Sequence, residues 1–256
     1  MEDNPLYGRK IFFLYPPSVV QEEMVINLLR EGYEVYLLRD HEKCIPLLKE
    51  YPDSVFFVNL DQVLSEIQWQ NFICRIIDNP LLKDVKLGVL TYNQDPVLEK
   101  RFTEIIKLPY GYIVLKISTK QSLEIILKVL EMHGTRGRRK YVRVKCDEDP
   151  PATFYVKIRE EIITGRVLDI SIAGMACVFD SKIVIPAGTA IEEIHINLHQ
   201  VVVRISGTVF VVRGDVKPVH VILFNKDINE LTVDKILTYI HFNLQHFLEK
   251  KLESFK

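Results

Sequence analysis

The sequence predicts two domains of different architecture, an α/β domain followed by an all-β domain. In the first half of the 256 residues, short apolar runs alternate with segments whose apolar residues recur at helical spacing, which favours a parallel sheet covered by helices. In the second half, β-branched runs follow one another closely without a helical period between them, which favours an antiparallel sheet. We therefore predict an α/β domain over 1–134, an arginine-rich linker over 135–145 and an all-β domain over 146–256.

Strands and helices are predicted to alternate along the first domain, with five of each. Right-handed crossovers between parallel strands place helices on both faces of such a sheet, so this order is typical of a flavodoxin-like or receiver-like domain. The third helix is expected over 62–77. The predicted strands cover 10–15, 33–38, 55–60, 86–91 and 112–117.

Residues typical of helix ends mark the last two helices of this domain. Asp95 followed by Pro96 is typical of an N-cap with proline at the first helical position. Ser118 with Gln121 three residues later has the pattern of a capping box, and Gly134 is expected to end that helix. The helix after Asp95 is expected to bury one face made of Leu98, Phe102, Ile105 and Ile106.

The chemistry of a phosphoacceptor receiver is only partly present in this domain. Such a receiver needs paired carboxylates after the first strand, but this chain continues as Phe13-Leu-Tyr-Pro16 there. Asp61 follows the third strand, Thr91 closes the fourth and Lys116 lies in the fifth. Without the acidic pair a Mg²⁺ ion would have too few oxygen ligands. We therefore predict a degenerate receiver-like interaction module rather than an active phosphoacceptor.

Strands separated by Pro, Gly, Asn or Asp are predicted throughout the second domain. Six closely spaced strands, with Gly207 available for a bulge or bend, fit a small antiparallel barrel. An amphipathic helix over 227–250 is expected to close the domain and to pack on the barrel or on a partner. The predicted strands cover 153–158, 162–170, 175–179, 190–198, 201–212 and 219–224, and the apolar stripe of the helix comprises Leu231, Ile236, Ile240, Leu244 and Leu248.

The linker carries the first of two motifs that point to a ligand. The run from Arg136 to Lys145 contains Arg139 and Arg143, four positions apart, among further arginines and lysines. A guanidinium presents a planar fork of donors that matches phosphate oxygens and also stacks on flat rings, so an arginine-rich segment suits a phosphorylated purine. Like-charge runs are also common in solvated linkers, and the run alone does not separate the two interpretations.

The second motif is Asp169-Ile-Ser171-Ile-Ala-Gly174, which follows the arginines after a β-rich stretch. Alone, this pattern is typical of a strand end and turn, in which Asp and Ser bond the local backbone and Gly supplies a positive φ. The order of the two motifs, an Arg-x-x-x-Arg pair, then Asp-x-Ser-x-x-Gly, then further strands, is more specific. It resembles the PilZ domain, a bacterial receptor module for cyclic di-GMP.

The resemblance to the PilZ domain covers the C-terminal half of the chain. It implies a six-stranded antiparallel PilZ barrel, with the arginine segment and the barrel motif closing over the dinucleotide. The arginine pair would contact phosphates and guanine faces, and the Asp and Ser would contact polar groups of guanine or phosphate. The Gly would shape the turn, and the residue before the arginine pair would influence whether one ligand or a stacked pair binds. The implied cyclic di-GMP-binding residues are Arg138, Arg139, Arg143, Asp169, Ser171 and Gly174.

One departure from the PilZ pattern lies near the end of the predicted barrel. The family often has a Gly before a strand of the Gly-Val-x-Phe kind, whereas this chain has His220-Val-Ile-Leu-Phe224, which raises a question about the packing of the last strand. The tandem arrangement is similar to the two-domain PilZ proteins of spirochaetes, the PlzA type. That similarity implies signalling to a protein partner through the N-terminal domain or the C-terminal helix, in the regulation of gene expression, motility or virulence. A PilZ-related N-terminal domain is an alternative fold for the first half.

Composition limits the classes of function. The formal net charge of −1 argues against a general nucleic-acid binder, which makes the basic run a local feature. The four cysteines are spread singly, so we expect no zinc site, no disulfide framework and a reducing cytoplasm. No apolar run is long enough for a signal peptide or a membrane span. No residue set suggests nucleophilic catalysis, and we predict a protein that is not an enzyme and needs no cofactor or metal.

Two other functions stay open at this level. A nucleic-acid-binding regulator would use the basic run 136–145, with Tyr141 stacking on a base. Its binding would weaken steeply with salt and would not respond to the dinucleotide. A phosphorelay component is disfavoured by the missing acids after the first strand.

Overall fold

The computed structural model describes residues 9–18, 20, 22–137, 139–146, 151–158, 161–199, 201–214 and 216–255. The chain divides into two compact units, one formed by 1–140 with 245–256 and the other by 141–244. The observed division differs from the predicted one at both ends of the second domain. Most of the linker, together with the last residues of the C-terminal helix, belongs to the first unit.

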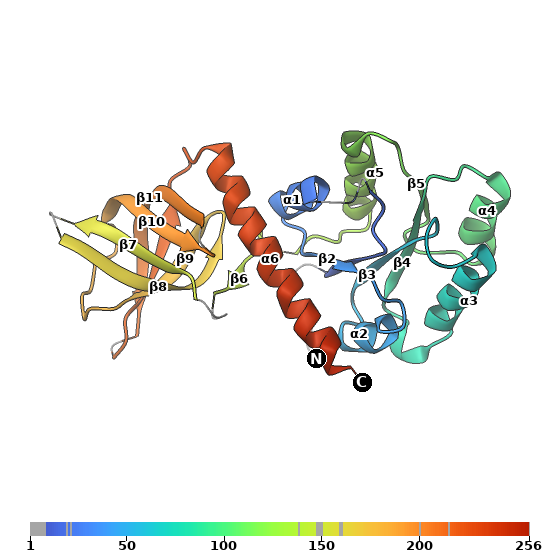
Figure 1. Cartoon of the computed structure of the whole chain (residues 1–256), viewed down its shortest axis with the longest axis horizontal. Coiled ribbons are helices and arrows are strands. Elements are labelled where there is room, and N and C mark those ends of the chain that lie inside the picture. Colours follow the sequence, from blue (N-terminus) through green and yellow to red (C-terminus); the bar gives the residue numbers. More distant parts are fainter. Residues whose placement is uncertain are drawn as a thin grey trace. The chain divides into compact units, whose positions relative to one another are not determined.

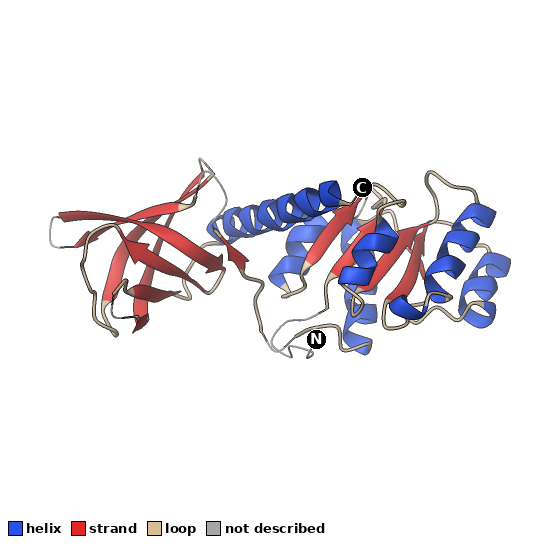
Figure 2. Cartoon of the chain, turned by 90° about the horizontal axis from the view of Figure 1, so that it is seen from below, coloured by secondary structure: helices blue, strands red, loops and turns tan. Residues whose placement is uncertain are grey.

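The first unit is built on a five-stranded parallel sheet with strand order β2-β1-β3-β4-β5. This is the flavodoxin-like order, which confirms the predicted fold class. Helices cover both faces of the sheet (Figure 2), which is why β1 and β3 are buried along their whole length. The strands are β1 (Ile11–Leu14), β2 (Val35–Leu38), β3 (Val55–Asn59), β4 (Lys86–Thr91) and β5 (Tyr112–Val114).

The fifth strand is shorter than predicted. It ends at Val114 rather than at 117, and Ile117 is 94% exposed. The helices are α1 (Glu22–Arg30), α2 (Cys44–Glu50), α3 (Glu66–Ile77), α4 (Pro96–Lys100) and α5 (Thr119–Met132), with a short 3₁₀ turn η1 (Pro80–Leu82) before β4 and a π-helical turn η2 (Arg101–Ile105) after α4. Helices α1 and α5 pack against each other (Figure 1).

A capping box forms at α3, whereas the one predicted at Ser118 does not form. Ser118 is the N-cap of α5 as expected, but its side chain makes no capping hydrogen bond. The capping box is instead at α3, where Ser65 accepts from the Gln68 N–H and the Gln68 side chain accepts from the Ser65 N–H. Helix α3 therefore begins at Glu66, four residues later than the prediction of 62.

The predicted apolar face after Asp95 is only partly buried. Asp95 caps α4 with Pro96 in the first turn, as predicted. Leu98 and Phe102 are buried, but Ile105 is 73% exposed. The π-helical turn η2 explains this correction, because its wider turn places one more residue per turn and rotates Ile105 away from the face that an α-helix would have continued.

The second unit is a closed antiparallel barrel of six strands. The ring runs β8-β7-β10-β11-β12-β9 and closes where β9 pairs with β8, while the two-residue strand β6 pairs with β8 outside the ring. Figure 1 shows this barrel in yellow to orange. Closure leaves the ring with no free sheet edge. The strands are β6 (Val144–Lys145), β7 (Thr153–Ile158), β8 (Glu161–Ser171), β9 (Gly174–Phe179), β10 (Ala190–Leu198), β11 (Val201–Arg213) and β12 (Val219–Phe224).

The last strand of the barrel packs well despite its departure from the PilZ pattern. His220 is fully buried in β12, and its Nε2 accepts a hydrogen bond from the Ile185 N–H at 3.0 Å. The His220 and Phe179 rings pack edge to face, with centroids 4.9 Å apart. Gly207 of β11 allows the close approach of β12, because a Cβ there would lie 2.6 Å from the Leu223 carbonyl oxygen.

The C-terminal helix α6 (Glu230–Ser254) carries residues of both units. Of its predicted apolar stripe, Ile236, Ile240, Leu244 and Leu248 are buried. Leu231 is 67% exposed, because at 3.6 residues per turn it lies about 140° around the helix from Ile236 and so is not on the buried face.

The final turns of α6 are fixed to the first unit. The Gln245 side chain donates to the Leu37 carbonyl at 2.9 Å and accepts from the Leu37 N–H at 3.1 Å. Leu37 lies on β2, the edge strand of the sheet, so a helix side chain satisfies backbone groups that a further strand would otherwise pair. Lys251 adds an ion pair with Glu50.

Candidate ligand site

Strand pairing brings the two sequence motifs together in the second unit. Val144 of β6 lies opposite Ile170 of β8, and Lys145 lies opposite Asp169. The Cys146 N–H extends this pairing with a bond to the Leu168 carbonyl at 2.8 Å. The chain leaving the arginine segment is therefore held alongside the strand that carries the Asp-x-Ser-x-x-Gly motif.

Arg143 and Asp169 form an ion pair across the two motifs. The distance from Arg143 Nη1 to Asp169 Oδ1 is 3.1 Å, and the side chains are 39% and 28% exposed. Asp169 Oδ1 is itself buried and makes no hydrogen bond beyond this ion pair. An exposed pair of this kind contributes only about 0–1 kcal/mol to stability. Both groups keep unused hydrogen-bonding capacity, since a guanidinium has five N–H donors and a carboxylate can accept about four bonds.

Ser171 has a structural role in this structure. It is 2% exposed, and its hydroxyl donates to the Gly174 carbonyl and accepts from the Ala173 N–H, both at 3.3 Å. These bonds close the turn between β8 and β9. The predicted contact of Ser171 with a ligand is untested, and the hydroxyl would have to leave or share these partners to make it.

Gly174 is required by close packing and not by a positive φ. It is absent from the positive-φ positions and begins β9 opposite Ser171. A Cβ at this position would lie 2.3 Å from the carbonyl oxygen of Ile222 on β12. Gly174 therefore shapes the turn by letting β12 approach, which corrects the expectation of a left-handed conformation for this glycine.

The first arginine of the pair lies in the other unit. Arg139 belongs to the first unit with the rest of 135–140, and Arg143 belongs to the second. The predicted site residue Arg138 lies outside the described residues. Sequence reasoning missed the residues of the turn after α1 that lie against this segment. Glu31 forms an ion pair with Arg136 at 3.0 Å, and a Cβ built on Gly32 would lie 2.4 Å from the Lys140 carbonyl oxygen.

The carboxyl edge of the parallel sheet has a polar cluster that is already satisfied. Asp61 accepts hydrogen bonds from the Thr91 hydroxyl and from the Tyr92 N–H. The Asn59 amide donates to the Tyr15 carbonyl at 2.8 Å and accepts from the Asp61 N–H at 3.1 Å. The groups that a receiver would present to a metal and a phosphate bond one another here.

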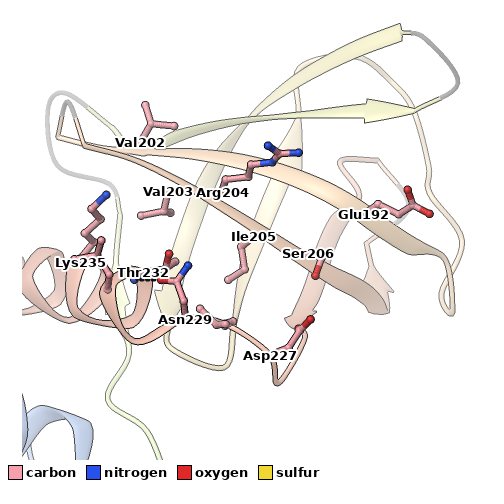
Figure 3. A pocket seen from close by; sticks show the side chains of 12 residues that line it. Glu192, Val202, Val203, Arg204, Ile205, Ser206, Asp227, Asn229, Thr232 and Lys235 are labelled. Carbon is pink, nitrogen blue, oxygen red and sulfur yellow. Dashed lines mark hydrogen bonds between the residues drawn. The ribbon is translucent and has the colours of Figure 1, made fainter.

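A separate groove of about 500 Å³ lies on the second unit between β11 and the start of α6. Figure 3 shows Lys235 and Glu192 at opposite ends of it, with Ile205 and Ser206 between them. None of the predicted ligand residues that the structure describes lines this groove.

Other site types find no support among the residues that the structure describes. No group of three or more His, Cys, Asp or Glu side chains in those ranges could hold a metal ion. Within the same ranges, no helix has the length and apolar character to cross a membrane. All four cysteines are free thiols, and burial, with a smaller effect of the Asp169 carboxylate, raises the pKa of Cys177 to about 12.

Comparisons with known proteins give structural likenesses only. No family model and no curated protein matches the sequence. The PilZ domain with c-di-GMP of YcgR from Escherichia coli is 21% identical with a TM-score of 0.39, and the match covers 46% of this chain and 98% of that one. MrkH of Klebsiella in complex with c-di-GMP is 16% identical with a TM-score of 0.38, covering 47% of this chain and 57% of MrkH.

A second group of likenesses concerns response regulators. The phosphorylated cyanobacterial phytochrome response regulator RcpA is 18% identical with a TM-score of 0.38, covering 48% of this chain and 93% of RcpA. The match to full-length YcgR spans 52% of that chain. At such TM-scores the function of this chain has to be inferred from its own residues.

Proposed function

We propose that this protein is a non-enzymatic receptor for cyclic di-GMP of the PilZ type. The observation that carries the proposal is the pairing of β6 with β8, which joins the Arg-x-x-x-Arg and Asp-x-Ser-x-x-Gly motifs through the Arg143–Asp169 ion pair. Two motifs from separate stretches of sequence meet with complementary charge and with donors and acceptors to spare. A basic linker without a binding role would not need to pair with β8, the strand that carries the second motif.

The ligand chemistry suits this arrangement. Cyclic di-GMP carries two phosphodiester anions and two guanines, so it offers both charged oxygens and flat rings. Arg143 would bind phosphate through its remaining donors or stack on a guanine face, and Arg139 would do the same from the other end of the pair. Asp169 would accept from guanine N–H groups, and the tight Ser171–Gly174 turn would hold this carboxylate in place.

Signalling would follow from where the two arginines belong. Arg139 is part of the first unit and Arg143 is part of the second, with three residues between them. A ligand held by both would restrain the chain that joins the units and so change the interdomain arrangement. Shifting a population from 1:99 to 99:1 needs about 5.5 kcal/mol of differential affinity, and a micromolar ligand supplies about 8 kcal/mol in total. The receptor would pass this change to a protein partner in the cytoplasm through the first unit or α6, in the regulation of gene expression or motility.

The alternative of a nucleic-acid-binding regulator is less well supported. Of the basic run 136–145, Arg136 pairs with Glu31 and Arg143 pairs with Asp169, so part of its charge is already neutralised within the protein. The affinity of a protein for a nucleic acid depends mostly on cations that are exposed together and not already paired with acidic side chains.

Calorimetric titration of the full chain with cyclic di-GMP tests the proposal. We expect saturable binding that is abolished by Arg143→Ala, with cyclic di-AMP as the matched nucleotide control that lacks guanine. A parallel titration with single-stranded DNA at two salt concentrations addresses the alternative. Steep salt dependence for DNA with no heat from cyclic di-GMP would reject the receptor and favour the nucleic-acid function.

A further inference from the structure

The start of the arginine segment is anchored to the first unit by a series of contacts, of which the later ones involve the turn after α1. Thr135 is 1% exposed, its hydroxyl is hydrogen-bonded to the Tyr110 hydroxyl at 2.8 Å, and its carbonyl accepts from the Arg9 N–H at 3.1 Å. The segment therefore leaves helix α5 from a fixed point.

A second anchor follows at the next residue. Arg136 pairs with Glu31 at 3.0 Å, and its guanidinium lies 5.0 Å from the centre of the Tyr33 ring. Glu31 is half exposed, so this ion pair alone is weak. The aromatic face adds a cation–π contact that fixes the direction of the side chain.

The third anchor comes directly after Arg139 and depends on a missing side chain. Gly32 has a φ of +87°, and a Cβ built on it would lie 2.4 Å from the Lys140 carbonyl oxygen and 4.0 Å from that of Arg139. Only glycine leaves room for the segment to cross the end of α1 at this distance. Its backbone conformation is also one that other residues rarely adopt.

We propose that Glu31, Gly32 and Tyr33 form a cradle that positions Arg139 for cyclic di-GMP. Anchors before and after Arg139 fix its backbone before the ligand arrives, so binding does not have to order that stretch of chain. The cradle residues are positioning residues, since none of them carries a motif group of the proposed site. The inference rests on the proposed function for its ligand, but the anchoring itself can be measured without any ligand.

Gly32→Ala is the main test, and Gly111→Ala is its matched control. Gly111 also has a positive φ, of +70°, and lies in the same unit, but a Cβ there meets nothing within 4 Å. Both changes place alanine at a positive φ, but only the alanine side chain at position 32 would clash with the backbone of the arginine segment. Without ligand, we expect trypsin to cut after Arg136, Arg139 or Lys140 faster in Gly32→Ala than in Gly111→Ala. With cyclic di-GMP, we expect about tenfold weaker binding for Gly32→Ala and no more than about a twofold change for the control.

A milder variant covers the case in which Gly32→Ala fails to fold. Glu31→Gln removes the ion pair without altering backbone, and we expect binding to weaken about twofold to threefold with a modest rise in cleavage. Equal cleavage rates in variants and controls would show that the cradle does not anchor the segment. Faster cleavage with unchanged or tighter binding would show that anchoring does not position Arg139. Absence of binding in the unaltered protein would instead remove the proposed function, whatever the cleavage pattern.

Discussion

Each unit of this protein has a polar cluster beside the end of a strand, and the two clusters differ in what they leave unsatisfied. At the carboxyl edge of the parallel sheet, the Asp61 carboxylate is bonded by the Thr91 hydroxyl and the Tyr92 N–H. On the barrel, Asp169 forms an ion pair with Arg143, and both side chains are partly exposed. A cluster whose members satisfy one another stabilises a fold, whereas a sparse, exposed pair keeps capacity for a ligand. The two carboxylate clusters therefore differ in the hydrogen-bonding capacity that they leave for a ligand.

The largest expected effect is the loss of ligand binding when either arginine of the pair is removed. Arg139→Ala and Arg143→Ala should each reduce cyclic di-GMP affinity by about 100-fold or more, because charge-assisted bonds of about 1.5–3 kcal/mol and ring stacking are lost together. Arg139→Lys should also lose most affinity, since an ammonium has neither the fork nor the flat face. Calorimetry gives the affinity, and thermal unfolding should be unchanged.

The matched control for these variants is Lys145→Ala, which removes an exposed cation from the same segment. We expect it to bind within a few-fold of the unaltered protein because a point charge is lost but no motif group. Wild-type affinity in Arg139→Lys, or equal losses in all three positions, would mean that charge alone attracts the ligand.

Much of the fold follows from local sequence patterns, and the exceptions have local causes. All six ring strands agree with the predicted bounds within one residue at each end, because alternation and turn residues mark them. The predicted burial of Ile105 is wrong because a π-helical turn shifts the helical period, and the spacing of apolar residues does not reveal such a turn. The predicted capping box at Ser118 fails because the pattern states which residues are present and not which bonds form.

The candidate site could be located from the sequence only where a motif itself contains the chemistry. Arg143 and Asp169, one from each motif, form an ion pair, and their contacts with a ligand stay a prediction. The contact of Gly32 with Lys140 joins positions more than one hundred residues apart, so only the tertiary structure shows it. Gly174 lies between these two cases. The sequence indicated that a glycine is needed there, but it predicted a positive φ, whereas the structure shows a close approach of β12.

A pair of carboxylate variants tests the comparison directly. Asp61→Ala should lower the free energy of unfolding by about 1–2 kcal/mol, because the buried Thr91 hydroxyl and a backbone N–H lose their acceptor, and it should leave ligand affinity unchanged. Asp169→Ala should change stability by less than about 1 kcal/mol and weaken cyclic di-GMP binding about tenfold. Chemical denaturation and calorimetry on both proteins measure the two quantities. The opposite assignment, with Asp169→Ala melting the barrel and leaving affinity intact, would make the barrel cluster the structural one.

The barrel turn provides a smaller effect within the same cluster. Ser171→Ala should weaken binding less than either arginine change and lower the free energy of unfolding by about 1 kcal/mol, since the Ala173 N–H loses its acceptor. If affinity fell as far as in Arg143→Ala with unaltered stability, the hydroxyl would contact the ligand instead of holding the turn.

Phosphorylation separates the two clusters in another way. Incubation with acetyl phosphate and Mg²⁺ should add no phosphate to Asp61, because both oxygens of its carboxylate are already hydrogen-bonded and the first strand supplies no acidic pair for the metal. Intact mass spectrometry is the measurement, with Asp61→Asn as the control. A gain of one phosphate that disappears in Asp61→Asn would show that this cluster is catalytically competent after all.

The smallest expected effect is a pH dependence of barrel stability that comes from His220. Burial lowers the pKa of this side chain, and its Nε2 already accepts the Ile185 N–H, which holds the ring neutral. In the unfolded chain His220 has an ordinary histidine pKa of about 6.5, so as the pH falls it binds a proton more readily there than in the folded barrel. Stability from this group is therefore complete above about pH 6.5 and falls as the pH drops below that value, by at most about 1.4 kcal/mol per pH unit until the folded pKa is reached. His220→Gln keeps an acceptor for the Ile185 N–H without a titrating group, so its unfolding free energy should fall less between pH 6.5 and 5.5 than that of the unaltered protein. Denaturation curves at those two pH values measure the difference, and parallel slopes for the two proteins would mean that His220 takes up its proton equally well in the folded barrel.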